Sequence, residues 1–316
     1  MIKSIWFKLM IKKQYFKKIS FIFVANNEYD WMYSYASHPV AKHLHEDIFR
    51  IYFSSRDTMN RSCGAYLDID INNPSKILNI ANNPILNPGK AGLFDDCGAQ
   101  ICSYVKNQEK EFLYYAGWNI HQTIPFKTYL GLAICDTKDE KFVKKFEIPI
   151  IDRTVEEPLS IGWVNVIYHE NKFKMWYEYN TKWECIDGNW EYFFDIRYAE
   201  SDDGINFNRN LATCIASSTK ERAVSRPSVL VDEDIYKMWY CYKVNEKYKI
   251  GYAESFDGLK WKRKDDLLIF DKSEEFWDSE ELAYPYVFKH NNQIYMLCNG
   301  NHYGKTGFGI FKLERN

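Results

Sequence analysis

Short segments in which apolar and polar residues alternate recur along most of the chain, and this pattern predicts β-strands rather than helices. The clearest case is the segment 226–261, where three such stretches, 227–231, 236–242 and 248–254, are separated by turn sequences. Valine, isoleucine, tyrosine and tryptophan in these stretches fit a pleated, half-buried surface, and Gly258 fits a turn that needs a positive φ. We therefore expect three antiparallel strands in this segment.

The same strand pattern is repeated along the chain. The sequence KMWY begins at residues 174 and 237, and the sequence YAES-x-DG begins at residues 198 and 252. Weaker copies of the middle strand lie at 49–53, 112–115 and 294–297, and copies of the following strand lie at 64–67, 131–134 and 307–310. Five units of roughly 50–60 residues are typical of propeller blades.

This repeat predicts an all-β, five-bladed β-propeller built of antiparallel four-stranded blades. A two-sheet sandwich is the alternative, and the lack of a long amphipathic helical pattern argues against a parallel-sheet enzyme. We expect a single propeller domain over residues 19–316, with residues 19–31 supplying the outer strand that closes the ring.

Residues 1–18 form the predicted N-terminal extension, which is both basic and apolar. Lysines at positions 3, 8, 12, 13, 17 and 18 interrupt it, so neither a signal-peptide core nor an integral membrane span is expected. Residues 2–13 could contact an anionic membrane peripherally, although an ordinary surface extension is the simpler interpretation.

Charge and cysteine usage narrow the classes of partner. The chain has 41 lysines and arginines against 43 acidic residues, so it lacks the basic excess of a nucleic-acid-binding protein and we expect no nucleic-acid partner. None of its 8 cysteines forms a C-x-x-C pair, which argues against a zinc site and predicts reduced, buried thiols in a cytoplasmic protein. We predict no metal ion and no other cofactor.

The innermost strands of a propeller surround a central channel, so polar residues at their starts converge although they are far apart in sequence. Two pairs of acids, Asp95 with Asp96 and Glu280 with Glu281, stand at such positions in the second and fifth units. Carboxylates from different blades suit general acid–base chemistry, because separate environments can keep one protonated and the other ionised. We therefore predict these four as catalytic, with Asp96 and Glu281 foremost. The alternatives are a turn cap for the first pair and a solvated surface position for the second.

Other residues near the predicted channel are candidates for substrate binding. His38 and Arg226 each precede a proline and could recognise a phosphate, a carboxylate or a sugar hydroxyl; the alternatives are a structural histidine and a salt bridge. The remaining candidates are Arg56, Arg61, Gln100, Trp118, Asn119, Trp163, Tyr284 and Asn301. The acids of the repeated YAES-x-DG sequence follow the blade period, so we assign Glu200, Asp203, Glu254 and Asp257 to turns and blade packing rather than to catalysis.

Several segments resemble the five-bladed β-propeller glycosidase superfamily that includes arabinanase-, levansucrase- and invertase-like enzymes. Among them are YFSSRDTMNRS (52–62), NPGKAGLFDDCGAQ (87–100), SRPSVL (225–230) and WDSEELAYPYVF (277–288). The likeness is greatest to glycosidase-related proteins encoded among bacterial surface-polysaccharide genes. It implies the propeller fold and a carbohydrate substrate.

The chain departs from that superfamily at two functional positions. Its members commonly carry Asp-Pro in the first blade, where this chain has His38-Pro39, and a glutamate before a proline in the fourth blade, where it has Ser225-Arg226-Pro227. We therefore do not assign the three catalytic carboxylates of that superfamily to residues of this chain.

Three functions follow as hypotheses. The first is a glycoside hydrolase-like enzyme acting on a glycoside or an activated sugar in surface-polysaccharide metabolism. The second is a glycosyltransferase with a phosphate-activated sugar donor, and the third is a non-catalytic glycan-binding propeller. The expected ligand is a sugar, an oligosaccharide or a sugar nucleotide.

Overall fold

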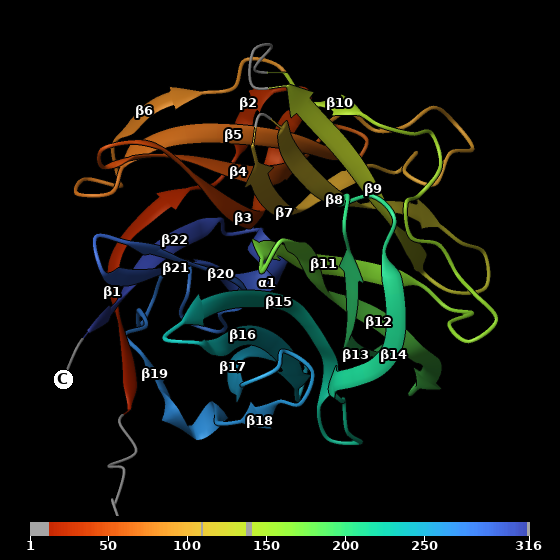
Figure 1. Cartoon of the computed structure of the whole chain (residues 1–316). Helices are drawn as coiled ribbons and strands as arrows, with labels where there is room; N and C mark the ends of the chain where they lie inside the picture. Colours follow the sequence, from red (N-terminus) through yellow and green to blue (C-terminus); the bar gives the residue numbers. More distant parts are fainter. Residues whose placement is uncertain (1–12, 109, 137–140, 315–316) are drawn as a thin grey trace, which may run out of the picture.

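The computed structural model describes residues 13–108, 110–136 and 141–314, and it arranges the strands as five sheets around a central axis (Figure 1). Blade 1 contains β2 (Asn26–Tyr29), β3 (Met32–His45), β4 (Ile48–Arg56), β5 (Ser62–Asp70) and β6 (Ile77–Ile80). Blade 2 contains β7 (Ala99–Asn107), β8 (Lys110–Ile120), β9 (Phe126–Asp136) and β10 (Val143–Lys144). Blade 3 contains β11 (Ile161–His169), β12 (Lys172–Ile186), β13 (Asn189–Ser201) and β14 (Asn208–Ile215). Blade 4 contains β15 (Arg222–Asp232), β16 (Ile235–Val244), β17 (Lys247–Ser255) and β18 (Lys262–Arg263).

Blade 5 combines both ends of the chain, in the strand order β19-β1-β22-β21-β20. Its strands are β1 (Gln14–Phe23), β19 (Leu268–Phe270), β20 (Ala283–His290), β21 (Gln293–Asn299) and β22 (Phe308–Glu314). Strand β1 pairs antiparallel with β22, and β19 is added to it in parallel. The ring is therefore closed by hydrogen bonds between the first and last described strands.

The predicted five-bladed propeller is thus confirmed, and the two-sheet sandwich is excluded. The antiparallel four-stranded core of each blade is as predicted, while blades 1 and 5 each carry a fifth short strand. The closing strand begins at Gln14, five residues before the predicted domain boundary at residue 19. Residues 26–29, which we had assigned to that strand, instead form β2 at the edge of blade 1. The proposed membrane contact of residues 2–13 falls almost wholly outside the described residues.

Apolar side chains fill the five interfaces between neighbouring blades rather than one central core. Ile22 and Phe308 of blade 5, for example, pack with Ile51 of blade 1, and Trp176 of blade 3 packs with Met238 of blade 4. The apolar side chains of each sheet pack against the neighbouring blades. The side chains that surround the central axis are therefore the polar and aromatic ones of the five innermost strands.

The repeated acids form turns, as predicted. In each copy the aspartate, Asp203 or Asp257, accepts backbone N–H groups from the two residues that follow the glycine, at 2.8–2.9 Å. The glycine carbonyl then accepts a hydrogen bond from the preceding blade, from the Tyr114 hydroxyl at Gly204 and from Trp176 Nε1 at Gly258, both at 2.8 Å. These turns therefore connect neighbouring blades, and we assign their acids no catalytic role.

None of the eight cysteines forms a disulfide, and six of them are buried. Cys97 is partly exposed and Cys185 is exposed, so the prediction of buried thiols is wrong for the latter. Cys185 lies near the end of a strand that extends beyond its blade, where no neighbouring blade covers it. Within the described part of the chain, no helix is long and apolar enough to span a membrane.

Candidate functional site

Each of the five innermost strands is interrupted by a bulge at an equivalent position. The register with the second strand breaks at His38-Pro39 in β3, at Cys102 in β7, at Gly162-Trp163 in β11, at Arg226-Pro227 in β15 and at Tyr284-Pro285 in β20. Bulges re-aim side chains and are common beside active sites.

Three of these bulges hold a non-glycine residue at positive φ. The φ angles are 57° for His38, 52° for Arg226 and 54° for Tyr284, and each residue precedes a proline. This conformation is costly for a residue with a side chain, so the surrounding structure must impose it. The strain is used to direct these three side chains toward the axis of the propeller.

His38 is held between two aromatic rings from other blades. Its ring stacks on Tyr284 with centroids 4.3 Å apart and on Trp163 with centroids 5.2 Å apart. The Ser37 hydroxyl oxygen lies 3.2 Å from the Ser54 carbonyl and 3.1 Å from His38 Nδ1; when the hydroxyl donates to that carbonyl, Nδ1 carries the proton and donates to the hydroxyl oxygen. That tautomer leaves the unpaired, buried Nε2 with its lone pair free to accept.

The electrostatic surroundings keep this imidazole neutral. Burial, and then the nearby positive charges of Arg226 and Arg56, lower the pKa of His38 well below 6.5. At neutral pH His38 is therefore a hydrogen-bond acceptor and not a cation.

A cavity of about 290 Å³ opens above this stack, and we call it the funnel. Its aromatic lining consists of Tyr35, Trp118, Phe126, Trp163, Tyr192, Tyr284 and Tyr303, and its polar lining consists of Ser37, His38, Arg56, Asn60, Gln100 and Thr128. None of these lining residues is an aspartate or a glutamate. The funnel is therefore aromatic and cationic, without a carboxylate in its wall.

Arg56 carries the positive charge of the funnel wall. Its guanidinium lies 4.8 Å from the centre of the Trp118 ring and 6.0 Å from that of Tyr35, and Nη1 donates to the Asn60 carbonyl at 3.1 Å. It makes no ion pair with any carboxylate among the described residues. Burial lowers its pKa from 12.5, but a guanidinium remains charged in proteins. A ligand with a negative group would supply the missing counter-charge.

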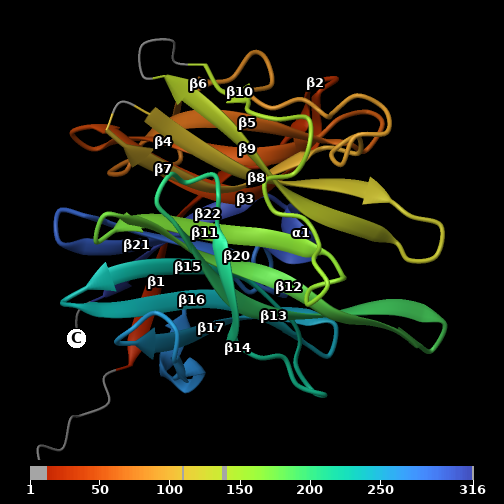
Figure 2. The ribbon, with the colours of Figure 1, turned by 45° about the vertical axis from the view of Figure 1, so that its right-hand side comes forward.

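Two long hairpins extend the wall of the funnel on one side. The β8–β9 and β12–β13 hairpins extend from the same end of the propeller (Figure 2). Phe126 joins them, because its ring centroid lies 5.2 Å from that of Trp183 and 5.8 Å from that of Tyr192. These hairpins supply Phe126, Thr128 and Tyr192 to the lining, which the repeat pattern did not single out.

Below the funnel, Glu178 of β12 lies buried at the axis and was not found from the sequence. It stands opposite the Gly162-Trp163 bulge, and a Cβ on Gly162 would come within 2.2 Å of its Oε1. Burial raises the pKa of Glu178 well above 4.5, and Ser225 and Arg226 offset only part of that shift. A signal did exist, because an acid interrupts the aromatic strand FKMWYEYN where the other KMWY copy has Cys241.

The carboxylates predicted as catalytic do not line the funnel. Asp96 accepts the Gly92 N–H at 2.9 Å and the Asn119 amide at 2.5 Å. Burial raises its pKa, but these hydrogen bonds outweigh burial and the net pKa is lowered. Its geometry matches the turn-capping alternative, and Asn119 is occupied in the same loop.

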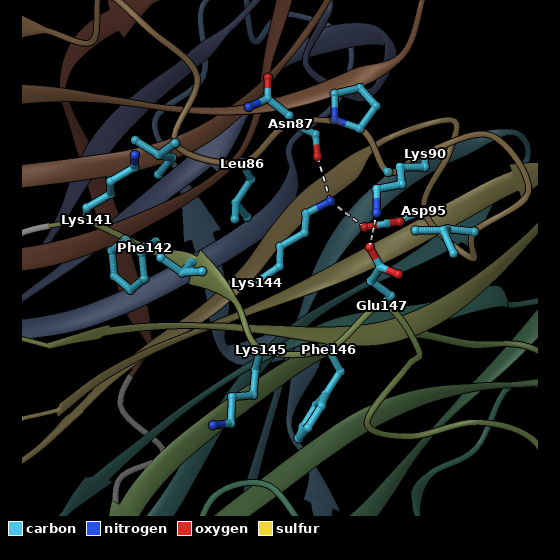
Figure 3. Close-up of a pocket in the computed structure, with 15 residues that line it drawn as sticks. Leu86, Asn87, Lys90, Asp95, Lys141, Phe142, Lys144, Lys145, Phe146 and Glu147 are labelled. Atoms are coloured by element: carbon cyan, nitrogen blue, oxygen red, sulfur yellow. Dashed lines mark hydrogen bonds and ion pairs between the residues drawn. The ribbon is translucent and has the colours of Figure 1, made fainter.

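Asp95 lines a different cavity, of about 480 Å³, at the outer edge of blade 2 (Figure 3). There Lys144 Nζ donates to Asp95 at 2.5 Å and to the Asn87 carbonyl at 2.6 Å, and Lys90 pairs with Glu147. This cavity is the larger of the two, but its two carboxylates, Asp95 and Glu147, are already paired with Lys144 and Lys90. The free polar groups that a ligand would need lie at the funnel instead.

Glu281 and Asn301 support the loop that covers one side of the funnel. Glu281 accepts the backbone N–H groups of Tyr248 at 2.8 Å and of His302 at 2.9 Å. Asn301 Oδ1 accepts the N–H groups of Glu280 and Glu281. Asn301 and His302 belong to α1 (Asn301–Gly304), whose next residue, Tyr303, reaches the lining. Glu280 is paired with Lys247.

The predicted site residues therefore divide into two groups. His38, Arg56, Gln100, Trp118, Trp163 and Tyr284 meet at the funnel, and Arg226 lies just beneath its floor. The residues outside the lining are Arg61, which is paired with Asp57, together with Asn119, Asn301 and the four acids Asp95, Asp96, Glu280 and Glu281. The predicted convergence of Asp96 and Glu281 with His38 in one cavity is thus not found, and their catalytic roles stay predictions. In the described residues no three His, Cys, Asp or Glu side chains gather as a metal site.

Comparison with known proteins gives relatives in sequence and in fold. No family model matches the chain. The uncharacterized proteins MT1551 and Rv1502 of Mycobacterium tuberculosis are each 39% identical to it over 299 residues, covering 94% of this chain and 99% of theirs.

Solved structures share the fold at low sequence identity. A glycosyl hydrolase from Bacteroides ovatus superposes with a TM-score of 0.71 at 12% identity, over 95% of this chain and 93% of that one. A structure described with the GH130 family of mannoside phosphorylases and hydrolases of β-1,2 mannosidic linkages has a TM-score of 0.71 at 11% identity, over 95% and 94%. The family 117 glycoside hydrolase Zg3597 of Zobellia galactanivorans has a TM-score of 0.66 at 14% identity, over 96% and 91%.

Proposed function

The chain belongs to the family of the mycobacterial proteins MT1551 and Rv1502 and shares the propeller fold of solved glycoside hydrolases, and on this premise we propose that it is a carbohydrate-active enzyme for anionic sugars. Specifically, it exchanges a glycosyl unit between a sugar hydroxyl and a phosphate group in the funnel. The observation that carries this proposal is the lining itself, in which aromatic rings surround an unpaired Arg56 and no carboxylate is present.

Hydrolysis by the usual route needs two carboxyl groups that flank the glycosidic bond. The funnel offers none in its wall, so a phosphate is the better partner for the anomeric carbon, because it brings its own negative charge and is held by a guanidinium. Aromatic rings suit the apolar faces of a sugar and the funnel presents seven of them. One solved neighbour is described with a family of mannoside phosphorylases that also contains glycoside hydrolases, and phosphorolysis is the same exchange run toward phosphate.

The proton in this exchange belongs to the sugar hydroxyl. In the transfer direction the bond from C1 to the phosphate oxygen breaks, the bond from C1 to the acceptor oxygen forms, and the acceptor hydroxyl loses its proton. The proton acceptor is the unpartnered Nε2 of His38, a residue that lines the funnel, and the phosphate leaves as an anion beside Arg56. In the reverse direction the same imidazole returns the proton to the departing hydroxyl oxygen.

The test is a turnover screen with three arms: sugar nucleotides or sugar 1-phosphates with a glycan acceptor, oligosaccharides with inorganic phosphate, and oligosaccharides without phosphate. We expect turnover in the first two arms only. Arg56→Met should raise KM for the phosphate-bearing substrate by roughly 10-fold or more, as expected for a charge-assisted contact worth about 1.5–3 kcal/mol. Arg153→Gln, an exposed arginine paired with Asp152, is the matched control. Phosphate-independent hydrolysis that survives Arg56→Met would refute the proposal.

A glycan-binding propeller without catalysis is the second candidate, and the carboxylate-free wall favours it too. It predicts saturable sugar binding in calorimetry with no turnover in any arm. His38→Phe separates the two candidates, because it keeps the aromatic stack and removes the proton acceptor. A catalyst should lose about 10²–10⁴-fold in kcat, while a binding module should retain its affinity.

We propose bacterial surface-polysaccharide metabolism as the setting and the cytoplasm as the location. The resemblance to glycosidase-related proteins of polysaccharide gene clusters supports the setting, and eight cysteines without a disulfide agree with a reducing compartment. Altered surface glycans in a deletion strain, and recovery of the protein in the cytoplasmic fraction, are the corresponding tests.

A further inference from the structure

Arg226 is a buried cation without a counter-charge. Its side chain is 1% exposed, and its one described hydrogen bond runs from Nη1 to the Cys102 carbonyl in the bulge of blade 2. Nε and Nη2 are buried without partners, and no described carboxylate lies within ion-pair distance. A guanidinium does not lose its proton, so burial here is expensive unless something else neutralises the charge.

The acid that could neutralise Arg226 does not reach it. Glu178 is the buried carboxyl that interacts with Arg226 electrostatically, yet the two make no ion pair, and the only group that lowers its pKa by hydrogen bonding is the Ser225 hydroxyl. Gly162 leaves the space that Glu178 occupies against blade 3, so its carboxyl is directed to its own blade. Burial also favours the protonated form, which carries no charge.

Other buried polar groups on the neighbouring strands also lack partners. They are the donor Trp163 Nε1 and both side-chain atoms of Asn180, which lies on the same face of β12 as Glu178, two residues along the strand. The one charged group among them without an ion pair is the Arg226 guanidinium, whose free N–H groups attract an anion and repel a metal cation.

We propose that the axis of the propeller binds a small inorganic anion of about the size of chloride, held by Arg226 and facing Glu178. Arg226 is buried and does not line the funnel, so a phosphate ester bound in the funnel does not reach it and its partner must be a small ion. The site is distinct from Arg56 and from the proposed reaction, and it makes the floor of the funnel electrically neutral where it would otherwise carry a buried positive charge.

The test is thermal unfolding in a buffer with gluconate as the sole anion, titrated with sodium chloride or bromide and, at equal ionic strength, with more gluconate. We expect a Tm that rises by roughly 2–4 °C for each tenfold increase in halide above its Kd, with no such rise in gluconate. Arg226→Met should abolish the halide response, whereas Arg153→Gln and Arg56→Met should keep it. Because these variants separate Arg226 from Arg56, failure here leaves the proposed reaction standing, and the reverse also holds.

A second measurement applies if Arg226→Met does not fold. Crystals of the unaltered protein soaked in bromide should show an anomalous peak within hydrogen-bond distance of the Arg226 guanidinium. Bromide peaks elsewhere only, equal responses to halide and gluconate, or stabilisation by phosphate and not by halide would each overturn the proposal.

Discussion

His38 shows how a single side chain is tuned by its place in the propeller. Its ring lies between Tyr284 and Trp163, one nitrogen is committed to Ser37, and two nearby guanidiniums oppose a positive charge on it. The protein thereby keeps a histidine that stays neutral over a wide pH range, which suits a group meant to accept a proton from a substrate hydroxyl.

This arrangement has a measurable effect on stability. Below pH 6.5 an unfolded chain protonates His38 while the folded chain does not, so the unfolded state binds more protons and the free energy of unfolding falls with falling pH. The loss reaches at most about 1.4 kcal/mol per pH unit, between 6.5 and the lowered pKa of the folded state. Denaturant titrations from pH 7 to 5 should show this slope and its disappearance in His38→Phe. His302→Phe, at a largely exposed position, should leave it intact; an equal slope in both variants would contradict the assignment.

Glu178 should behave with the opposite sign. The folded state holds its proton above pH 4.5 while the unfolded state releases it, so wild-type stability contributed by this group is lost as pH rises above 4.5. Glu178→Gln cannot ionise, and it should become more stable relative to wild type between pH 5 and 8 in equilibrium unfolding.

A second buried acid provides the control for Glu178. Glu157 accepts from Arg197 and Arg209 at 2.8 and 2.7 Å, so Glu157→Gln breaks buried ion pairs and should cost about 3–5 kcal/mol. Equal destabilisation by both changes would mean that Glu178 is ionised in the folded protein.

The sequence predicted some site residues and missed others for a physical reason. His38, Arg226 and Tyr284 were predicted because each stands at the start of an innermost strand; in the structure a bulge before a proline directs each of them to the axis. Asp96 and Glu281 were expected at the same end, but a carboxylate that accepts backbone N–H groups in a turn has the same local sequence as one that faces a cavity. Only the hydrogen bonds distinguish the two, and they depend on the fold.

At the scale of strands and turns, the bulge opposite Glu178 is the element at which we expect a small added side chain to have the largest effect. A methyl group on Gly162 would lie 2.2 Å from Oε1 and 2.9 Å from Cδ of Glu178, so Gly162→Ala must displace either the acid or the bulge that carries Trp163. We expect a loss of about 1–3 kcal/mol in unfolding free energy, the usual cost of overpacking, together with weaker sugar binding at the funnel.

The double variant identifies the source of that loss. If the clash is with the Glu178 side chain, Glu178→Ala should absorb it, and a double-mutant cycle should give a coupling energy of roughly 0.5–3 kcal/mol. Additive effects of the two changes would show that the backbone of the bulge, rather than Glu178, is the strained partner.

Elements with a repeat were predictable, whereas elements without one were not. The KMWY strands and the YAES-x-DG turns established the blades, because the same packing between neighbours demands the same residues in each copy. The length of the β12–β13 hairpin was not predicted, since its far half leaves the blade and follows no repeat. Tyr192 was therefore not predicted to line the funnel.

At the scale of the whole molecule, the ring is held closed by the N-terminal strand. β1 lies between β22 and β19, so blade 5 is complete only when both ends of the chain meet (Figure 1). The closing strand was expected a few residues later because the lysines among residues 13–18 suggested a solvated extension. In the structure Lys17 is exposed beside the buried Phe16, and Lys18 pairs with Asp278, so the strand accommodates both lysines.

Phe16 is the residue on which this closure can be tested. It is fully buried, stacks on Phe270 with centroids 5.4 Å apart and meets the edge of Trp239, a blade 4 residue, at 6.4 Å. Removing a buried phenylalanine ring costs about 3–5 kcal/mol, so Phe16→Ala should lower the unfolding free energy by that amount and open the seam between blades 4 and 5. Ile19→Ala, on the same strand but 38% exposed, should cost less than about 1 kcal/mol. Hydrogen exchange should show faster exchange in β1 and β22 for Phe16→Ala, with blades 2 and 3 unchanged. Equal losses in the two variants, or protection of β1 and β22 that survives the change, would mean that strand pairing alone closes the ring.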